Sequence, residues 1–444
     1  MNSDIRVLNI ETDFATIARR VSFVFAKGKM SENLVANVRA TVVNRAGTEA
    51  TGCGSIHLAG PWAFPSKAVP TPHKRETMRR AVELLANTVQ DFGEYAHPLD
   101  YYWALREEIL KAAHEASTAM GLAEPLPPLA AYVSYGAIDM ALLDAFGKVN
   151  GISAYAGLGQ EHCAHDLSHY LGPRFEGRYL SDFLAVEPAA AVPFAHTVGE
   201  ADPLTKADLD GSEPDDGLPV ALDDWIRRDR VRFLKVKADG SCVDTAIGRT
   251  VAVFELAKAI APGRAKLSID FNEACATAEW LVEYLRKLQE QSPAAFDALG
   301  YVEQPFDRDA DLSAEDVARV QAFKPLVADE SMTDCESVRR VLECGWRGIA
   351  LKVAKVMTSS LLHVAAALDA CRLLTVQDLC NSGLAHVASV GLAARIPLFG
   401  GAECNGRQFV PHAFPEVQAA HKPAFAFADG VCRANSTVGL GLGF

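Results

Sequence analysis

A repeated alternation of short apolar runs and helical stretches, starting near residue 190, constrains the fold of this chain more than any other feature. Eight runs have the length and the branched or aromatic residues of strands. Helical stretches lie between them, and such repeats build parallel sheets. The pattern therefore predicts a (β/α)8 barrel. In chain order the runs are AAAVPFAHTVG, VRFLKVK, KLSIDFN, GYVEQP, PLVADES, GIALKVAK, LLTVQDL and IPLFGG.

The chain before this repeat has two other patterns. Apolar and polar positions alternate over residues 5–60, which predicts an antiparallel meander with turns at Lys27–Gly28 and Arg45–Gly47. From Arg75 to about Lys148 the apolar period becomes that of helices. The last of these helices is apolar on nearly all sides, so we expect it to be buried and to stop by Gly151.

These patterns predict an α/β protein of two domains. A chain of 444 residues exceeds a typical single domain. We assign residues 1–160 to an N-terminal domain and residues 161–404 to the barrel. A long acidic loop, residues 199–219, follows the first barrel strand and is expected on the catalytic face, either as a lid or without a role.

Composition and charge exclude several classes of partner. The net charge is −13, whereas a surface that binds nucleic acid is basic. No apolar run approaches the length of a membrane span, and the N-terminus lacks a signal-peptide pattern. The ten cysteines include no C-x-x-C pair, which is typical of reduced thiols. We therefore expect a cytoplasmic enzyme that contacts neither nucleic acid nor membrane.

Charged residues stand at the predicted C-terminal ends of consecutive strands, where a barrel of this kind has its active site. Residues two apart on a strand share a face, so the two lysines of the second strand point the same way. The following charged residues are each separated by about one βα unit. The set consists of Lys235, Lys237, Asp270, Glu303, Asp329 and Lys352, with Glu330 next to Asp329.

This arrangement of charges indicates a divalent cation and a general base. Three carboxylates that converge in an apolar barrel mouth repel one another unless a cation neutralises them, and oxygen ligands suit Mg²⁺. A carboxylate substrate on the metal becomes more acidic at its α-carbon, because the metal stabilises the enediolate. A lysine base must be neutral, and we expect its lysine neighbour and the metal to lower its pKa. Solvated lysines in salt bridges are the alternative.

The motifs FLKVK, IDFNE, VEQP, VADES and ALKVAK, in this order, resemble those of the enolase superfamily in its muconate-lactonizing subgroup. The segment YGAIDMALLDAFGKVNGISAYAGLG resembles the helix that links that family's capping domain to its barrel, and the resemblance spans about residues 20 to 405. It implies a modified (β/α)8 TIM barrel with an α+β capping domain. The cap would be built from the N-terminal region and the tail, residues 405–444.

The resemblance also implies a role for each strand-end residue. Lys237 and Lys352 would be the acid and base on opposite faces of the substrate, with Lys235 in support. Within LKVAK we assign catalysis to Lys352, which ends the apolar run, and expect Lys355 to begin the next helix. One Mg²⁺ would be bound by Asp270, Glu303 and Asp329. Asn272 and Glu330 match positions that orient ligands and lysines.

The last two strand ends depart from the family's patterns. A related branch has a catalytic histidine at the seventh strand end, whereas this chain has TVQDLCNSG, which favours the lysine–lysine branch. Gln377, Asp378 and Asn381 of this stretch either contact substrate or are ordinary strand-end residues. Dipeptide epimerases have two aspartates after the eighth strand, but GGAECNG offers only Glu403 and Asn405. A dipeptide with a free amine is therefore not supported, and Glu403 remains a candidate substrate contact.

Two further segments have open interpretations. Trp62, in the loop SIHLAGPWAFPS, is expected to form an apolar wall over the substrate, with packing on the helices as the alternative. HCAHDLSHY carries His162, Cys163, His165 and His169, which could form a zinc site or be a chance group in an interdomain connector.

Two facing lysines permit 1,1-proton transfer. Racemisation or epimerisation of an amino-acid or hydroxy-acid derivative is therefore our first hypothesis. Cycloisomerisation and dehydration share the enediolate and remain alternatives. The expected partner is a small-molecule carboxylate, and the family resemblance implies a homo-oligomer.

Two other classes of protein account for fewer of these strand-end residues. A Schiff-base lysine at position 237 or 352, as in some barrel aldolases, leaves three carboxylates without a purpose. A barrel kept only as a scaffold would bind no metal.

Overall fold

The structure is a computed structural model that describes residues 1–25 and 28–444. It begins with an antiparallel sheet in the order β1 (Ile5–Phe25), β2 (Gly28–Asn44), β3 (Glu49–His57). This confirms the predicted meander and its second turn, where Asn44 Oδ1 accepts hydrogen bonds from the amides of Ala46 and Thr48. Lys27, in the first predicted turn, lies outside the described residues.

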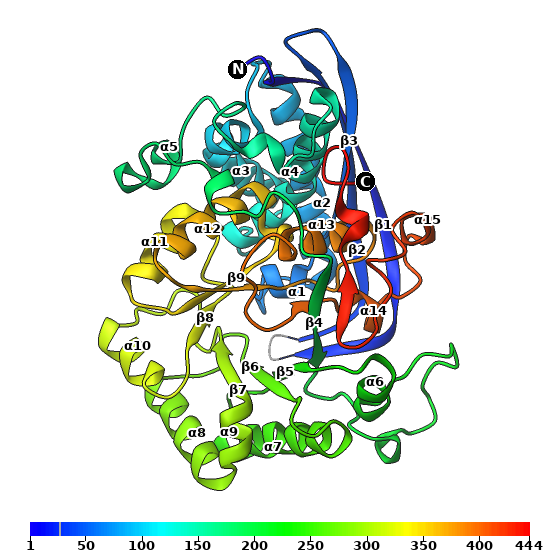
Figure 1. The fold of residues 1–444 in the computed structure, drawn as a ribbon, viewed down its shortest axis with the longest axis vertical. Coiled ribbons are helices and arrows are strands. Elements are labelled where there is room, and N and C mark those ends of the chain that lie inside the picture. Colours follow the sequence, from blue (N-terminus) through cyan, green and yellow to red (C-terminus); the bar gives the residue numbers. More distant parts are fainter. Residues whose placement is uncertain (26–27) are drawn as a thin grey trace.

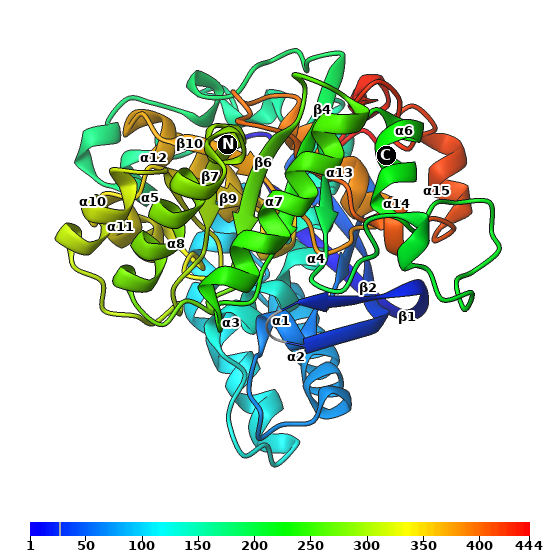
Figure 2. The same cartoon turned by 90° about the horizontal axis from the view of Figure 1, so that it is seen from below.

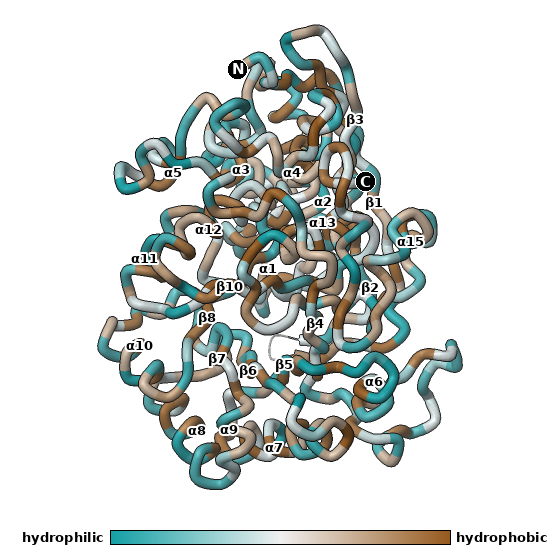
Figure 3. Tube along the Cα trace, in the orientation of Figure 1, coloured by the Kyte–Doolittle hydropathy of each residue, from teal (hydrophilic) through white to brown (hydrophobic). Residues whose placement is uncertain are grey.

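Four helices follow the sheet: α1 (Gly60–Ala63), α2 (Thr71–Asp91), α3 (Pro98–Ala119) and α4 (Pro128–Asn150). Helix α4 is buried along almost its whole length and ends at Gly151, whose φ of 68° is left-handed and suits glycine. Both expectations for the last helix are confirmed. Figure 3 shows apolar residues gathered in the interior, with hydrophilic residues predominating in the outer loops.

Helix α4 corrects one expectation from the sequence. By length and composition alone, this helix could cross a membrane. The sequence suggests that no apolar run approaches the length of a membrane span. The apolar part of the helix is completely buried inside the protein. Helix α4 contacts both β3 and the 3₁₀ turn η5 (Val353–Lys355) of the barrel. The protein core therefore accounts for its apolar character.

Eight parallel strands form a nearly closed barrel in the order β10-β9-β8-β7-β6-β5-β4-β11 (Figures 1 and 2). A parallel bridge joins Leu374 of β10 to Leu398, in the segment just before β11, on the side where the ring closes. The strands are β4 (Ala191–Val198), β5 (Phe233–Lys237), β6 (Lys266–Asp270), β7 (Leu299–Glu303), β8 (Leu326–Ala328), β9 (Gly348–Leu351), β10 (Leu373–Val376) and β11 (Ala402–Glu403).

The predicted barrel is thus confirmed, with one correction. The expected eighth strand, IPLFGG, contributes one bridge residue, Leu398, and the regular strand β11 begins directly after this run, beyond the turn at Gly400, whose φ is 79°. Helices cover the outside of the ring. They are α6 (Leu222–Asp229), α7 (Val243–Ile260), α8 (Ala278–Gln291), α9 (Pro293–Ala298), α10 (Ala314–Gln321), α11 (Cys335–Glu343), α12 (Met357–Asp369) and α13 (Gly383–Ala393).

The C-terminal tail contacts both parts of the molecule. It contains α14 (Gly406–Phe409), α15 (Pro415–Ala420) and β12 (Val431–Arg433), and β12 pairs antiparallel with β4. Further on, the Leu442 amide donates a hydrogen bond of 3.0 Å to Asp144 Oδ1 in α4. The limits of the two domains, at residues 160 and 404, stay a prediction.

Strand β3 packs directly on α4, which leaves no room for a side chain at Gly54. A Cβ there would lie 2.0 Å from the carbonyl oxygen of Ala137. We predict that Gly54→Ala lowers the free energy of unfolding by about 1–3 kcal/mol, as overpacking does. Urea denaturation measures this change. Gly248 is exposed on the outer side of α7, with open space around a new Cβ. Gly248→Ala should therefore raise the free energy of unfolding by up to about 1 kcal/mol. Equal effects would contradict the close contact.

Asp139 joins α4 to α12. Its Oδ2 accepts a 2.8 Å hydrogen bond from the Thr358 amide, and burial raises the pKa of its carboxyl to about 7. In the unfolded chain the pKa is about 4. The folded state therefore favours the protonated form, whose stabilising contribution is complete below pH 4 and is lost as the pH rises through 7.

We predict that the stability of the wild type falls relative to Asp139→Asn between pH 4 and pH 7, by up to about 4 kcal/mol. Urea unfolding of both proteins at several pH values measures the difference. A difference that stays constant with pH would contradict the raised pKa.

Candidate active site

The charged residues expected at the strand ends all lie at the C-terminal rim of the barrel. Lys237 pairs in register with Asp270, and Asp270 with Glu303, on adjacent strands. Asp329 directly follows β8, and Lys352 follows β9. All are buried, and the most exposed of them, Lys237, has an exposed fraction of 7%. Parallel strands thus bring charges from distant segments to one rim.

Lys235 is the centre of this group. Its Nζ lies 2.6 Å from Glu303 Oε1, 2.9 Å from Asp270 Oδ2 and 3.0 Å from Glu403 Oε1. It also donates a hydrogen bond to Gln377 Oε1. Burial acts to lower the pKa of this ammonium, but the three carboxylates raise it well above its usual range. Lys235 is therefore a permanent cation that ties four strand ends together.

The other two predicted lysines each pair with one carboxylate. Lys237 Nζ lies 2.5 Å from Asp270 Oδ2 and donates a 2.9 Å hydrogen bond to Asn272 Oδ1. Lys352 Nζ lies 2.6 Å from Asp329 Oδ2. Burial acts to lower the pKa of Lys352, but Asp329 raises it overall. The lowering that we expect from a lysine neighbour is thus outweighed at Lys352 by its carboxylate.

Sequence reasoning misses Lys355. Its buried Nζ lies 2.7 Å from Asp329 Oδ1 and donates a hydrogen bond to the Asp329 carbonyl. Burial lowers the pKa of Lys355, against the effect of Asp329. The expectation that Lys355 begins a helix is wrong, because α12 starts at Met357 after Val356, whose φ of 70° redirects the chain. The spacing of three residues from Lys352 is the one available signal.

Trp62, in α1, forms one side of the site. Its Nε1 donates a 2.7 Å hydrogen bond to Glu330 Oε1, and the Lys352 ammonium lies 4.2 Å from its ring centroid. The same Glu330 oxygen accepts a 3.0 Å hydrogen bond from Asn272 Nδ2. Burial, followed by the charge of Asp329, raises the pKa of Glu330 to about 7. Trp62 and Asn272 therefore hold Glu330 in place beside Asp329.

The four candidates at the seventh and eighth strand ends lie in different surroundings. Gln377 Nε2 donates a 2.6 Å hydrogen bond to Glu303 Oε2. The Asp378 carboxylate accepts backbone hydrogen bonds, among them one of 2.8 Å from the Asn405 amide. The Asn381 side chain donates to Ser389 Oγ and lines another cavity. Asp378 and Glu403 line the cavity above the lysines, and Gln377 and Asn381 do not.

This cavity has a volume of about 40 Å³. Lys237 and Lys352 line it from β5 and β9, which lie four strands apart in the ring and therefore face each other. Much of the remaining wall is apolar and comes from Trp62 and from Phe23, Phe25 and Met30 of β1 and β2. Pockets for small molecules measure about 300–1,000 Å³. The cavity therefore has to enlarge before a substrate of that size enters.

Arg20, on β1, holds the long loop that follows β4. Its Nε and Nη2 pair with Asp216 at 2.6 and 2.8 Å, and it donates hydrogen bonds to the carbonyls of Leu218 and Pro219. Its side chain is only 6% exposed. The loop 199–219 is thus attached to the strand that contributes Phe23 and Phe25 to the cavity. The attachment connects the loop to the wall of the cavity, and its two interpretations, a lid or a loop without a role, both stay predictions.

The donor set of Asp270, Glu303 and Asp329 fits a hard divalent cation in its chemistry, because three carboxylates end adjacent strands. Burial raises the pKa of Glu303 well above its usual range. The nearby ammonium of Lys235 acts to lower this pKa, whereas the neighbouring carboxylates raise it further. A cation would relieve this repulsion. The three are not a cluster whose ligand atoms all lie within 4.8 Å of one another. Lysine ammonium groups pair with them instead, as Lys235 does with Glu303 and Lys352 with Asp329. Metal binding therefore requires these lysines to shift.

The connector between the two parts of the molecule does not bring together the four candidate zinc ligands of HCAHDLSHY. Cys163 is buried with its Sγ 4.0 Å from His97 Nε2, and the His162 ring packs on Phe146. Only His165 and His169 lie together, with ring centroids 4.1 Å apart. Cys163 is buried in the core, so the four side chains do not form one zinc site, which was one of the two interpretations left open.

Comparison with known proteins places the fold. Residues 220–444, more than half of the chain, match the model of the Enolase C-terminal domain-like family. No curated protein matches the sequence.

Three solved structures illustrate the structural similarity. A muconate lactonizing enzyme from Pseudomonas fluorescens, complexed with muconolactone, is 18% identical over 99% of this chain and 96% of its own, with a TM-score of 0.62. A 2-chloromuconate cycloisomerase from Rhodococcus opacus is 18% identical over 99% and 96%, with a TM-score of 0.63. A dipeptide epimerase from Enterococcus faecalis, complexed with Mg and a dipeptide, is 17% identical over 90% of each chain, with a TM-score of 0.58.

The capped parallel barrel, with lysines and carboxylates around its C-terminal rim, defines an enzyme of the enolase superfamily fold. The chain belongs to the Enolase C-terminal domain-like family, and its resemblance to the muconate-lactonizing subgroup is confirmed.

We predict that Asp216→Ala releases the loop from Arg20. Because a largely buried guanidinium loses its paired carboxylate, amides of residues 199–219 should exchange with deuterium about tenfold faster, as measured by mass spectrometry. Asp210→Ala is the matched control, since Asp210 is exposed and bonds only within the loop. Equal exchange in both variants would contradict the clamp.

Proposed function

We propose that this enzyme removes the α-proton of a small carboxylate substrate through an enediolate, with Mg²⁺ as cofactor. The observation that carries the proposal is the position of Lys237 and Lys352, which line one cavity from facing strands. One lysine can remove a proton from one face of a planar intermediate while the other delivers a proton to the opposite face. This geometry supports racemisation or epimerisation of an amino-acid or hydroxy-acid derivative as the proposed reaction.

Asp270, Glu303 and Asp329 would hold the Mg²⁺, which when bound neutralises charge that develops on the substrate carboxylate. Donors of oxygen alone support this choice of metal. The Mg-containing dipeptide epimerase structure is similar in fold, which is consistent with the same cofactor. Asn272 and Glu330 would orient the ligands and lysines, and Lys235 would hold Glu303 and Asp270 in place.

Protonation of Lys352 depends on Asp329. While Asp329 is free to pair with it, the ammonium form is favoured. If Asp329 instead held the metal, Lys352 would lose the partner that stabilises its charge, and its burial would favour the neutral form needed in a base. Trp62, whose ring lies against Lys352, and the apolar side chains of β1 and β2 would exclude water from the proton transfer.

We also propose a cytoplasmic location and a homo-oligomeric state. All ten cysteines are free thiols, which supports a reducing compartment. The net charge of −13 supports a protein that does not bind nucleic acid. Family resemblance alone supports the oligomer, and light scattering after gel filtration tests it.

We predict that proton NMR in D₂O, with Mg²⁺ and pooled N-acylated amino acids, dipeptides, betaines and sugar acids, detects α-proton exchange with the skeleton intact. Each lysine serves one face, so with a single enantiomer Lys237→Ala and Lys352→Ala should each abolish racemisation. In one variant, the rate of α-proton exchange should fall by about 10²–10⁴-fold for one enantiomer of the substrate. In the other variant, the rate should fall by a similar factor for the mirror-image enantiomer.

Lys258→Ala, an exposed lysine on α7, is the matched control and should exchange as the wild type does. EDTA or Asp270→Asn should remove the activity. Ring closure or loss of water in place of exchange would transfer the same site to a cycloisomerase or a dehydratase. Exchange that survives both lysine substitutions would contradict the proposal, as would the absence of both Mg²⁺ binding by calorimetry and turnover. Trapping of a substrate by borohydride would identify a Schiff-base lysine instead.

A further inference from the structure

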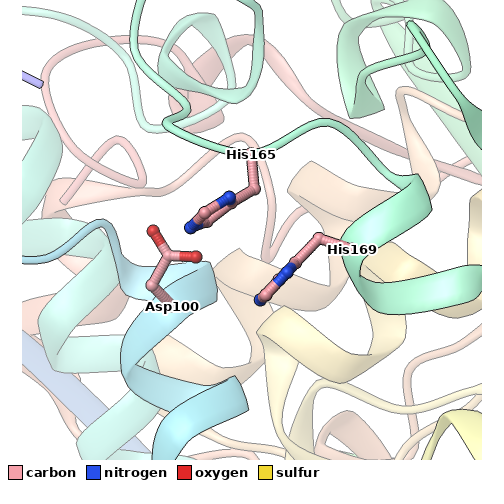
Figure 4. Close-up of side chains that lie close together, drawn as sticks. All are labelled: Asp100, His165 and His169. Atoms are coloured by element: carbon pink, nitrogen blue, oxygen red, sulfur yellow. The ribbon is translucent and has the colours of Figure 1, made fainter.

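Three side chains with metal-binding groups meet on the surface, outside the site described above. Asp100 comes from the first turn of α3, and His165 and His169 come from the connector around α5 (Ser168–Leu171) (Figure 4). One ligand atom of each lies within 4.8 Å of the other two. In the part of the chain that the structure describes, no other three His, Cys, Asp or Glu side chains come this close.

The two imidazole rings are arranged to share a ligand. They stack with an interplanar angle of 15° and a centroid distance of 4.1 Å, and Figure 4 shows their edges turned toward the Asp100 carboxylate. No hydrogen bond within residues 1–25 and 28–444 involves either ring. Stacked imidazolium cations would repel each other, and burial together with His165 lowers the pKa of His169. The lowered pKa favours the neutral form of His169, which is the form that binds metals.

The third ligand is held in position from behind. The Tyr170 hydroxyl donates a 2.5 Å hydrogen bond to Asp100 Oδ1, and the other carboxylate oxygen has no hydrogen-bond partner among the described residues. Such support from a second residue is typical of carboxylate and histidine ligands in metal sites. On its other side the His169 ring packs against Trp103, with centroids 5.8 Å apart. The cluster is thus built from α3 and the connector together.

We propose that Asp100, His165 and His169 form a second metal site, for Zn²⁺ or a similar divalent transition metal, with water in the fourth position. Two imidazoles and one carboxylate are zinc ligands, whereas Mg²⁺ and Ca²⁺ prefer oxygen alone. Asp100 and His165 are 65 residues apart in the chain. The bound ion therefore ties the connector, which leads from α4 to β4, onto the cap helix α3. The site is independent of the proposed proton transfer.

The test uses the untagged full-length protein, stripped with a chelator and then loaded with 10 mM Mg²⁺ so that the oxygen-rich site at the strand ends is occupied. Calorimetry with Zn²⁺ and visible spectroscopy with Co²⁺ then report a nitrogen-containing site of low coordination number. We expect one equivalent to bind with micromolar or tighter affinity and to give intense tetrahedral Co²⁺ bands. Zn²⁺ should also protect residues 160–180 from deuterium exchange.

His165→Ala, His169→Ala and Asp100→Asn should each weaken Zn²⁺ binding at least about tenfold, and Tyr170→Phe by a similar factor because the carboxylate loses its support. His114→Ala, an exposed histidine on the same helix α3, is the matched control and should bind as the wild type does. Asp270→Asn should leave the Zn²⁺ equivalent unchanged, which separates this site from the proposed magnesium site. Wild-type protein that binds Zn²⁺ only at millimolar concentration, or variants that bind normally, would overturn the proposal.

Discussion

The pairing of buried lysines with buried carboxylates at the barrel rim is the interaction on which the rest of the structure depends. A single charge buried without a partner costs several kcal/mol, so each of these groups requires its neighbours. Lys235 contacts three carboxylates, and Asp329 contacts two lysines. If the register of any strand shifted by one residue, its charged side chain would point to the opposite face of the sheet. The network therefore fixes the register of β5 to β9 as well as the site.

The cap is as much part of this network as the barrel. Trp62 donates a hydrogen bond to Glu330, and the Lys352 ammonium lies over the same indole ring. A residue of the cap therefore contacts two charged groups of the barrel. The cap reaches this position because α4 sits directly on the turn η5, where a Cβ at Gly136 would lie 2.7 Å from the Ala354 carbonyl. Close packing of α4 therefore positions both the cap and the chain that carries Lys355.

Much of the fold and site could be predicted, because charged residues interrupt apolar runs at intervals of one βα unit. That spacing is enough to identify Asp270, Glu303 and Lys352 in the amino-acid sequence, as well as the barrel itself. What escaped prediction depends on local chain direction or on distant contacts. The positive φ of Val356 brings Lys355 inward, the turn at Gly400 displaces the eighth strand, and His165 and His169 meet a partner on another helix. None of these has a periodic signal.

The same charges explain why the site is closed here and what would open it. With lysines as partners, the carboxylates are compensated and the cavity is small, so the rim forms a compact, self-paired state. Any ligand that takes over Asp270 and Asp329 removes a partner from Lys237 and from Lys352. Both lysines line a cavity whose wall is largely apolar and also contains the carboxylates of Asp378 and Glu403. A buried ammonium without a carboxylate is unfavourable, and it is relieved either by loss of a proton or by an anionic substrate. In the proposed mechanism, metal, substrate and base would therefore be coupled through the charges of this buried network.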